Sequence, residues 1–576
     1  MGHDAGEFQF VPYIFGIPHI TGYPLFLLIG KAWTFLPLGS VAWRMNLLSA
    51  LFGALAAGVA CAAGWQLTGS AAGGTLAGLA TGLASLEWTW STIAGVRSLA
   101  VAFVAAALLA ALRWEEAVRD GDPKLAERRF VLLALVCGLA LDNHRTFALL
   151  LPFLGLYVLM VRWRTLGQTR VLEKAAVAFL VPLLLYGVLP LRAAMGAPWD
   201  QLNTATWRGF VNLTIAGSDA GAHFNLTPGQ ALARLPALIA ALSGTFTFVV
   251  LAVAAIGLVW LAARRRPMTI VLAGYVLVLG WLTLEWHLGD ELNLVYFLPA
   301  YPALALLAAA GLAAMTGLEW GVGSRESGVR GRLGRVRLGA QLVLVAAVAG
   351  GGLYLGRARF EPPRETLDDF RADLFQGHQA RRLADALALL PGNATVVGDW
   401  DQASALWYAE FVDGINPSAA ISYPASTLPD ALGRAPGPVY LATATFRPPT
   451  TTVSAAGPYV EVLREPRGTL PPGVTQLGGS FGDEMQLSAM APIGQPEYGV
   501  LPVTLYWTAL KQPSADDHVS VRLMPSPDRV AAQRDEASPV LGLSPTSTWK
   551  PGQVTADYYE LDLRGLPDGA YDLAVV

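Results

Sequence analysis

A series of long apolar segments between residues 41 and 356 constrains this chain more than any other feature of its sequence. A helix needs about 20 apolar residues to cross the hydrocarbon of a bilayer. The chain is 53% hydrophobic and only 14% charged, whereas soluble domains carry roughly 25% charged residues. We therefore predict a polytopic α-helical membrane protein. About ten segments fit the length rule, and they lie near 41–67, 71–90, 97–114, 130–142, 146–161, 174–191, 242–262, 268–286, 294–316 and 338–356.

Two regions depart from this simple pattern. The segments 130–142 and 146–161 are short, so we expect a tilted or partly re-entrant pair around residues 142–145. Residues 22–37 are apolar, aromatic and bounded by prolines. We interpret them as a helix that lies at the membrane interface or dips into it.

Net charge and cysteine usage exclude several classes of protein. The formal net charge is −3, and no basic stripe interleaves with aromatic residues, which argues against a nucleic-acid partner. The two cysteines, Cys61 and Cys137, both lie inside apolar runs. This placement excludes a disulfide framework and argues against a thiolate metal site. The abundance of Ala, Leu, Gly and Arg is typical of proteins from GC-rich bacterial genomes. We therefore expect the protein to lie in a bacterial cell membrane.

The charged loops predict how the bundle is oriented. Basic residues gather in alternate loops, at 113–129, 162–174, 264–266 and 325–337, and the positive-inside rule places such loops in the cytoplasm. The remaining loops and the region after residue 356 then lie outside. A chain that begins outside needs a segment that carries its start across, so we expect a first helix upstream of Met1. The final strand around 571–576 likewise reads as interrupted, and we expect a truncated chain at both ends.

The region after residue 356 changes character twice. A charged linker, a helix at 380–390 and short strands at 393–398 and 439–442 predict a small α/β domain over 357–455. Asp399 and Asp401 follow the first of these strands, and we interpret them as helix-capping residues. From 456 to 576 apolar residues alternate with polar ones between Pro- and Gly-rich turns, which predicts a β-sandwich. We expect this sandwich to fold independently, while residues 1–356 form the membrane domain.

The membrane half contains an ordered set of short motifs. They are Asp4-x-Gly-Glu-Phe8, His19 with Gly22–Phe26, Arg44–Ala50, Gly138–Thr146, Leu189–Arg192, and Asp290–Glu291 with Tyr296–Pro299. In this set the chain resembles a family first catalogued as a domain of unknown function and related to protein O-mannosyltransferases of the GT-C membrane fold. The chain departs from the usual pattern of that family in two places, because the family commonly has His-Pro-Pro-Gly at 19–22 and a glutamate at the position of Gly95.

The resemblance implies a GT-C-like membrane domain and a glycosyltransferase reaction. Such enzymes move a sugar, with mannose as one candidate, from a polyprenyl-phosphate donor to an extracytoplasmic hydroxyl on a protein or glycan. One inverting displacement needs one general base, and we assign it to Asp4, supported by Glu7 in a tight first external loop that Gly6 permits. The phosphate leaving group calls for preorganised positive charge and hydrogen-bond donors. The residues implied in donor binding are His19, Tyr23, Arg44, Arg97, Asn143, His144 and Arg192.

Simpler roles remain open for these residues. Asp4 and Glu7 can be solvated charges, His19 can shape a turn, and Asn143 and His144 can cap helices. The arginines can place their charged ends at a membrane interface. The sequence demands no cofactor. A divalent cation on Glu285, His287, Asp290 and Glu291 is an alternative to a solvated loop there.

Two other classes of function also remain open. A transporter would place charges on an internal pathway, but transporters usually show internal repeats, and none is evident. A noncatalytic receptor or scaffold could recognise glycans through the sandwich. A lipid-linked-sugar glycosyltransferase explains the ordered motifs best.

Overall fold

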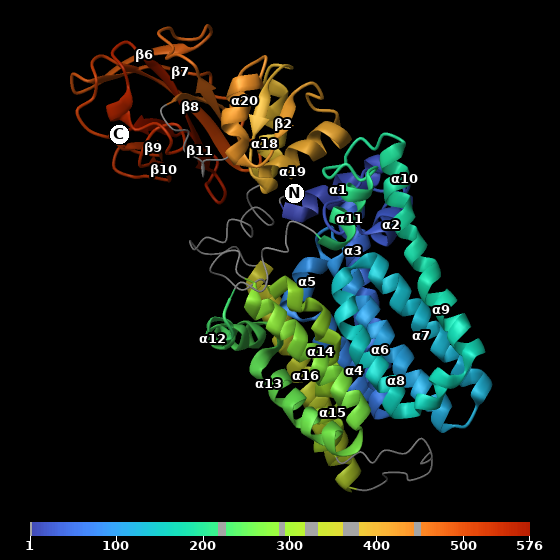
Figure 1. Cartoon of the computed structure of the whole chain (residues 1–576). Helices are drawn as coiled ribbons and strands as arrows, with labels where there is room; N and C mark the ends of the chain where they lie inside the picture. Colours follow the sequence, from blue (N-terminus) through green and yellow to red (C-terminus); the bar gives the residue numbers. More distant parts are fainter. Residues whose placement is uncertain (1–2, 217–225, 287–293, 317–331, 361–378, 443–450) are drawn as a thin grey trace. The chain divides into compact units, whose positions relative to one another are not determined.

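A computed structural model describes residues 3–216, 226–286, 294–316, 332–360, 379–442 and 451–576. The chain divides into two compact units (Figure 1). One unit holds residues 8–361, and the other holds residues 362–576 together with 1–7. The division passes through the first helix, between Glu7 and Phe8. Each unit is described separately below.

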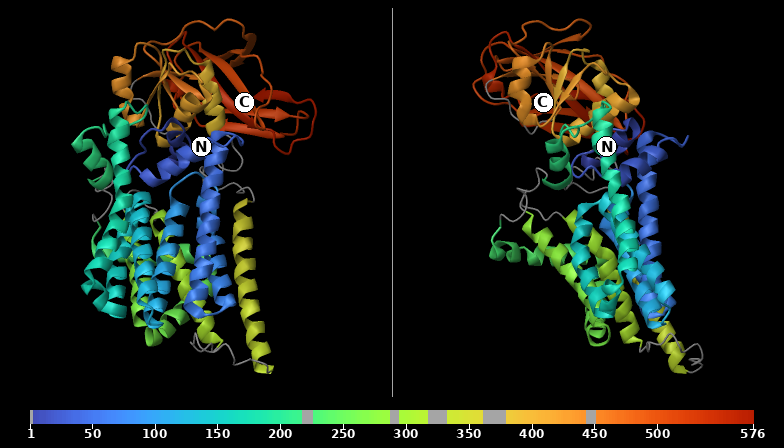
Figure 2. Two further views of the ribbon diagram at one scale, coloured as in Figure 1. Left: turned by 90° about the vertical axis from the view of Figure 1, so that its right-hand side faces the viewer. Right: turned by 45° about the vertical axis from the view of Figure 1, so that its right-hand side comes forward.

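The unit of residues 8–361 is a helical bundle whose long helices run side by side in all views (Figures 1 and 2). Its shorter or interfacial helices are α1 (His3–Ile14), α2 (Pro24–Trp33), α4 (Ala71–Gly82), α5 (Ser85–Ser91), α10 (Val188–Ala194), α11 (Trp207–Val211) and α12 (Pro228–Ala233). The longer ones and their 3-10 extensions are α3 (Val41–Thr68), α6 (Arg97–Arg119), α7 (Pro123–Asn143), η1 (Arg145–Leu150), α8 (Leu151–Arg162), α9 (Thr169–Leu183), α13 (Leu235–Arg264), α14 (Arg266–Glu285), η6 (Leu294–Ala300), α15 (Tyr301–Met315) and α16 (Arg332–Phe360).

Within the described residues, seven helical segments are long and apolar enough to cross a membrane. They agree with seven of the expected spans: 41–68, 97–119, 145–167, 169–194, 235–264, 266–285 and 294–315. The expected span 71–90 is instead broken into α4 and α5. The segment 130–142 is the apolar end of α7, and α16 has a shorter apolar core, Gln341–Tyr354. Helix α2 has ten residues, so it is too short to cross a bilayer.

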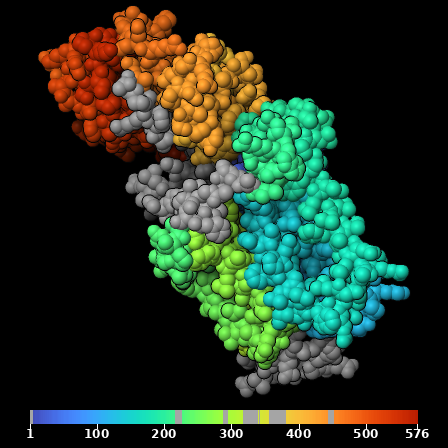
Figure 3. Space-filling view, viewed as in Figure 1, coloured from blue at the N-terminus to red at the C-terminus, as the bar shows by residue number. Residues whose placement is uncertain are grey.

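The surface of the bundle is apolar where lipid is expected. Only 17% of the apolar window in residues 169–194 is buried, and these residues form an outer face of the bundle, drawn in teal in Figure 3. Val177 and Leu184 on this face are exposed, at 61% and 74%. In contrast, 94% of the window in η6 and α15 is buried, so α15 is the central helix.

Two glycines allow α15 to lie directly against α13. A β-carbon at Gly257 of α13 would lie 1.8 Å from the carbonyl oxygen of Leu307. In the same way, a β-carbon at Gly311 of α15 would lie 1.9 Å from the carbonyl oxygen of Val253. Small residues let transmembrane helices approach backbone to backbone, where dispersion contacts replace the missing hydrophobic driving force.

The unit that ends at Val576 begins with a mixed α/β sheet. Its strands are β1 (Thr395–Val397), β2 (Ala420–Ser422), β3 (Val439–Leu441), β4 (Thr452–Ala456) and β5 (Tyr459–Leu463), in the order β2-β1-β3-β5-β4. The first three strands are parallel and the last two antiparallel. Its helices are α18 (Gln379–Ala386), α19 (Trp400–Tyr408) and α20 (Leu428–Arg434).

Two further sheets form the predicted sandwich. One has the order β11-β8-β7-β6 and the other β10-β9-β12. Alternating burial in β8 and β9 places Val503, Leu505 and Trp507 in one core with Val519 and Val521. The strands are β6 (Thr475–Phe481), β7 (Met485–Met490), β8 (Val500–Ala509), β9 (Val519–Met524), β10 (Ala532–Glu536), β11 (Val554–Asp562) and β12 (Asp572–Val575). The helical bundle followed by an α/β sheet and a sandwich agrees with the predicted order of domains.

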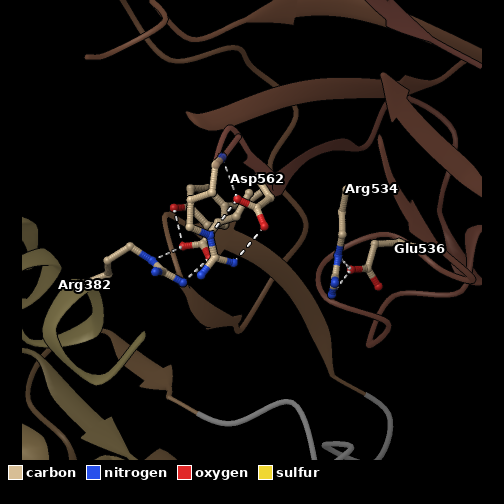
Figure 4. A network of polar contacts seen from close by, with 7 residues as sticks. Arg382, Arg534, Glu536 and Asp562 are labelled. Carbon is tan, nitrogen blue, oxygen red and sulfur yellow. Dashed lines mark hydrogen bonds and ion pairs between the residues drawn. The ribbon is translucent and has the colours of Figure 1, made fainter. Parts of the chain in front are cut away.

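The α/β sheet and the sandwich share a core and a partly buried ion pair. Val453 and Val460 of the sheet pack in one cluster with Ala556 and Tyr558 of β11. Arg382 of α18 donates to both carboxylate oxygens of Glu560 on β11, at 3.1 and 2.6 Å (Figure 4). The expected boundary at 455/456 falls inside the β4–β5 hairpin, which completes the α/β sheet.

The close contact of α13 and α15 predicts that one methyl group added between these helices lowers the stability of the bundle. Gly311→Ala should destabilise the bundle by about 1–3 kcal/mol, because overpacking forces the two backbones apart. Thermal unfolding in detergent measures this effect. Gly58→Ala in α3 is the matched control, since no heavy atom lies within 4 Å of a β-carbon there. Equal melting temperatures for Gly311→Ala and wild type would contradict this packing.

A buried carboxyl in β11 predicts pH-dependent stability of the C-terminal unit. Asp557 is fully buried and accepts from the Val540 amide at 2.7 Å, and burial raises its pKa to about 6. Since this folded-state value exceeds the unfolded value, the contribution of Asp557 to the free energy of unfolding is present at low pH. It is lost as the pH rises towards about 6.

Residues 379–576 should therefore lose roughly 1–1.5 kcal/mol from this group between about pH 5 and pH 7.5. Urea unfolding at the two pH values, followed by tryptophan fluorescence, measures the change. In Asp557→Asn the free energy of unfolding should change less between these two pH values. An unchanged difference in that variant would show that Asp557 is not the group responsible.

Candidate active site

The two acids of the first motif lie in a helix, and the expectation of a tight loop around Gly6 is wrong. Asp4 and Glu7 fall in α1, three residues apart, so they occupy neighbouring positions on one helix face. Asp4 is half-buried in the first turn, where the helix dipole favours a carboxylate. Its Oδ1 accepts from Nε1 of Trp400 at 3.1 Å, within the unit that contains residues 1–7 and 362–576. Glu7 is fully buried.

Phe8 holds the turn that follows α1. Its ring lies 5.5 Å from the ring of His19 and 5.4 Å from that of Tyr23. The Tyr23 hydroxyl donates to the Ile20 carbonyl at 2.5 Å, which closes the turn. The ring of Tyr23 also stacks on His144, 5.8 Å away. Three of the predicted donor-binding residues therefore gather around one aromatic cluster.

His144 lies in the corner between α7 and η1, outside the span 145–167. Its Nδ1 accepts from the Thr146 amide at 3.3 Å and lies 2.7 Å from the Thr146 hydroxyl. Burial and the charges of Arg97, Arg145 and His19 lower the pKa of His144 to about 3. The imidazole is therefore neutral, and because Nδ1 accepts, its Nε2–H is the available donor.

The break between α5 and α6 is held by side chains from other helices. Asn46 Oδ1 accepts from the Ala94 amide at 2.9 Å. The Ser49 hydroxyl accepts from the Gly95 amide at 3.1 Å and donates to the Gly95 carbonyl at 3.3 Å. Asn143 Nδ2 donates to the Val96 carbonyl at 3.0 Å. Backbone groups inside a membrane protein need such internal partners.

Arg97 follows this break as the first residue of α6. Its guanidinium lies 4.7 Å from the ring centre of Trp90 on α5, an attractive cation–π geometry. A buried network pins α5 to α6 in addition, because Ser91 donates to Glu87 at 3.1 Å and lies 3.1 Å from the hydroxyl of Ser98.

A small cavity opens beside Arg97 and His144 in the bundle unit. Helix α6, the α7–η1 corner and η6 supply its walls. It combines a cation, an imidazole and two hydroxyl-bearing side chains with apolar surface, which is a composition suited to an anionic headgroup on an apolar chain. The lining residues are Arg97, Ala100, His144, Thr146, Val295, Tyr296, Leu298 and Pro299.

Arg44 and Arg192 make contacts that hold loops. Arg44 Nη1 donates to the carbonyls of Thr34 and Leu36, both at 2.5 Å, and so ties the α2–α3 connection to α3. Arg192 Nε donates to the Phe15 carbonyl at 2.8 Å, which ties α10 to the end of α1. Neither residue lines the cavity, and donor binding by these two arginines stays a prediction.

Two remaining sequence predictions concern Gly95 and the acidic loop. At Gly95 a β-carbon would have only Phe8 Cδ2 within 4 Å, so a β-carbon itself would meet no close contact there. Glu285 is buried at the end of α14, while His287, Asp290 and Glu291 lie outside the described residues. Among the residues that the structure describes, no three His, Cys, Asp or Glu side chains gather as a metal site would require.

Residues 4–167 match the family of the protein O-mannosyl-transferase TMEM260 N-terminal domain. This match confirms the resemblance inferred from the motifs. Protein O-mannosyl-transferase TMEM260 of Mus musculus is 36% identical over 217 residues, which is 36% of this chain and 30% of that protein. Its Dictyostelium discoideum counterpart is 26% identical over 243 residues, 38% of this chain and 29% of that protein. This chain thus spans about a third of the length of these relatives.

The fold itself is shared with a solved membrane enzyme. ArnT from Cupriavidus metallidurans superposes with a TM-score of 0.50 both in its apo state and bound to undecaprenyl phosphate. Each superposition covers 80% of this chain and 93% of ArnT, at 14% and 15% identity. At this identity the likeness establishes the GT-C fold. Together with the names of the TMEM260 relatives, it supports a glycosyltransferase.

The contacts of several residues at the site could not be predicted from the sequence. Asn46 and Ser49 lie in the matching segment Arg44–Ala50, and their spacing of three residues is the one signal that they face the same neighbour. Tyr296 lies in the matching segment Tyr296–Pro299, but neither it nor Trp90 shows a local signal for its place beside Arg97. Phe8 belongs to the first motif, but its role as the centre of the aromatic cluster depends on a tertiary arrangement.

Proposed function

We propose that this chain carries the catalytic membrane domain of a glycosyltransferase. It would take a sugar, with mannose as the first candidate, from a polyprenyl-phosphate donor and transfer it to a hydroxyl of an extracytoplasmic protein or glycan. The observation that carries the proposal is the gathering of Arg97 and His144 around one cavity in a bundle of GT-C fold. The TMEM260 relatives, named as protein O-mannosyl-transferases, support the class of reaction.

The donor phosphate would bind at this cavity. Arg97 is held by Trp90 and supplies a positive charge that is already in place before the leaving group develops its own. His144 would contribute a neutral Nε2–H donor, and Tyr296 and Thr146 are the hydroxyl-bearing neighbours. Apolar Val295 and Leu298 suit the first part of a polyprenyl chain. ArnT bound to undecaprenyl phosphate supports a lipid of this kind.

The general base would come from α1. A carboxylate of Asp4 or Glu7 takes the proton of the acceptor hydroxyl while its oxygen forms a bond to the anomeric carbon. The bond from that carbon to the phosphate oxygen breaks, and the lipid phosphate leaves. We assign the base to Asp4, because it is half-buried and its carboxylate can meet an acceptor. The buried Glu7 has an orienting role.

The assignment of the base predicts an ordering of variants. In the full-length protein, Asp4→Asn should lower turnover by about 10²–10⁴-fold, the usual contribution of a general base, and Glu7→Gln should cost less. Transfer of radiolabelled sugar from polyprenyl-phosphate donors measures both. Arg97→Ala should act differently from the variants of the base, because it should raise the KM for the donor. Near-normal transfer by Asp4→Asn would remove Asp4 from this role, and an inactive Glu7→Gln would then assign the base to Glu7.

The positions of the basic loops support a multi-pass cell-membrane protein with its C-terminal unit on the extracytoplasmic side. Composition favours a bacterial plasma membrane. Arg264 is exposed at the end of α13, and Asp430 lies in α20 of the C-terminal unit.

Single cysteines introduced into a Cys61→Ala, Cys137→Ala background test this topology. An impermeant thiol reagent on intact cells should label Asp430→Cys and spare Arg264→Cys until the membrane is opened. Labelling of Arg264→Cys from outside would reverse the proposed orientation.

A further inference from the structure

The carboxyl edge of the parallel strands in the C-terminal unit gathers an unusual set of side chains. Asp399, Trp400 and Asp401 follow β1, and Tyr423 follows β2, the strand paired beside it. The carboxyl ends of adjacent parallel strands meet at one edge of a sheet, which is where open α/β sheets bind ligands. In Figure 1, α19, β2 and α20 lie together at this part of the unit.

Two aromatic rings form a corner at this edge. The rings of Trp400 and Tyr423 have centroids 5.2 Å apart and are inclined by 60° to each other. Trp400 also packs edge-on against Trp407, at 5.9 Å, and Trp407 is buried in α19. Trp400 is therefore fixed from behind, while Tyr423 remains 43% exposed. Solvent-exposed aromatic rings backed by a rigid core are suited to contact an apolar face of a ligand.

The side chain of Asp399 at this edge does not serve the local purpose that its sequence position predicts. Asp399 is the N-cap residue of α19, yet its side chain accepts no capping hydrogen bond from that helix. Its Oδ1 instead faces the loop after β2, 3.4 Å from the Ala425 amide. The interpretation of Asp399 as a simple helix cap is therefore wrong. Asp401 stands half-buried in the first turn of α19.

An amide side chain completes the set. The β-carbon of Gln402 lies over the end of β1, where a β-carbon on Gly398 would be 3.3 Å from it. Gln402 Oε1 is buried and has no hydrogen-bond partner among the described residues. A buried amide oxygen without a partner costs free energy, so this group is poised to accept from a ligand hydroxyl. Its NH₂ group has two further hydrogen atoms that can be donated to a ligand.

We propose that this edge is a binding site for a pyranose ring of a glycan. A sugar ring presents an apolar face of C–H groups, rimmed by hydroxyls that both donate and accept hydrogen bonds. The Trp400–Tyr423 corner matches the apolar face, Asp399 and Asp401 match donating hydroxyls, and Gln402 matches either kind. A simple cation would need acceptors alone. All residues of this site belong to the C-terminal unit, where Trp400 also donates to Asp4. The proposal stands whether or not the bundle transfers sugar.

The test uses the full chain in a detergent without a sugar headgroup, so that the detergent does not compete. Saturation-transfer NMR with methyl α-mannopyranoside and methyl β-glucopyranoside should show contact with ring protons for at least one of them. A Kd of about 1 mM or weaker is the scale expected for so small a ligand. Tyr423→Ala should weaken binding about 3–10-fold, and Asp401→Asn about tenfold.

Tyr498→Ala is the matched control, because Tyr498 is 40% exposed on the sandwich of the same unit, and it should bind like wild type. Arg97→Ala should also bind like wild type, which distinguishes this site from the donor cavity. Absence of sugar contacts in the wild-type protein would overturn the proposal. Binding that survives both Tyr423→Ala and Asp401→Asn would overturn its location. Stronger binding of N-acetylarginine amide than of either sugar would overturn the ligand class.

Discussion

The bundle depends on how it satisfies the backbone at the break between α5 and α6. A helix that stops inside a membrane protein exposes amide and carbonyl groups that water does not reach, and each one left without a partner is costly. Here Asn46 and Ser49 of α3 and Asn143 of α7 supply those partners for residues 94–96. Two helices, α3 and α7, are therefore fixed to one short loop. That loop delivers Arg97 to the cavity at a set position.

The same arrangement explains why the candidate site is rigid. Arg97 lies between the loop on one side and Trp90 on the other, so its charge is held in place. His144 is stacked on Tyr23 and hydrogen-bonded to Thr146, which fixes which nitrogen can donate. Catalysis by electrostatic preorganisation requires groups of this kind, which need little rearrangement when charge develops.

Sequence reasoning located the bundle, the sandwich strands and much of the aromatic cluster, because each has a local signature. Apolar length predicts spans, alternation predicts strands such as β8, and the motifs around His19 and His144 are contiguous. Sequence reasoning failed where contacts between distant residues determine the local conformation. Asp4 and Glu7 were expected in a loop because Gly6 stands between them, but the rest of the segment favours a helix and Glu7 is buried in it. The expected span 71–90 is broken after Gly82, and no periodicity in that apolar run marks the break.

The roles of the arginines could not be separated from sequence for a related reason. Arg44, Arg97 and Arg192 all stand near the ends of apolar segments, where an arginine can bind phosphate, hold a loop or reach the interface. Their partners are backbone carbonyls for Arg44 and Arg192 and an indole ring for Arg97. Backbone partners leave no trace in a sequence, since any residue supplies a carbonyl.

The β4–β5 hairpin bears on how this chain could be remodelled in evolution. It completes the α/β sheet by pairing with β3, while its residues Val453 and Val460 share a core with β11. Arg382 and Glu560 join the two layers again across 178 positions of sequence. A recombination event that exchanged the sandwich for another module would have to cross this shared core. It would leave apolar side chains and a charged group without their partners, so the two layers are expected to have been inherited as one piece.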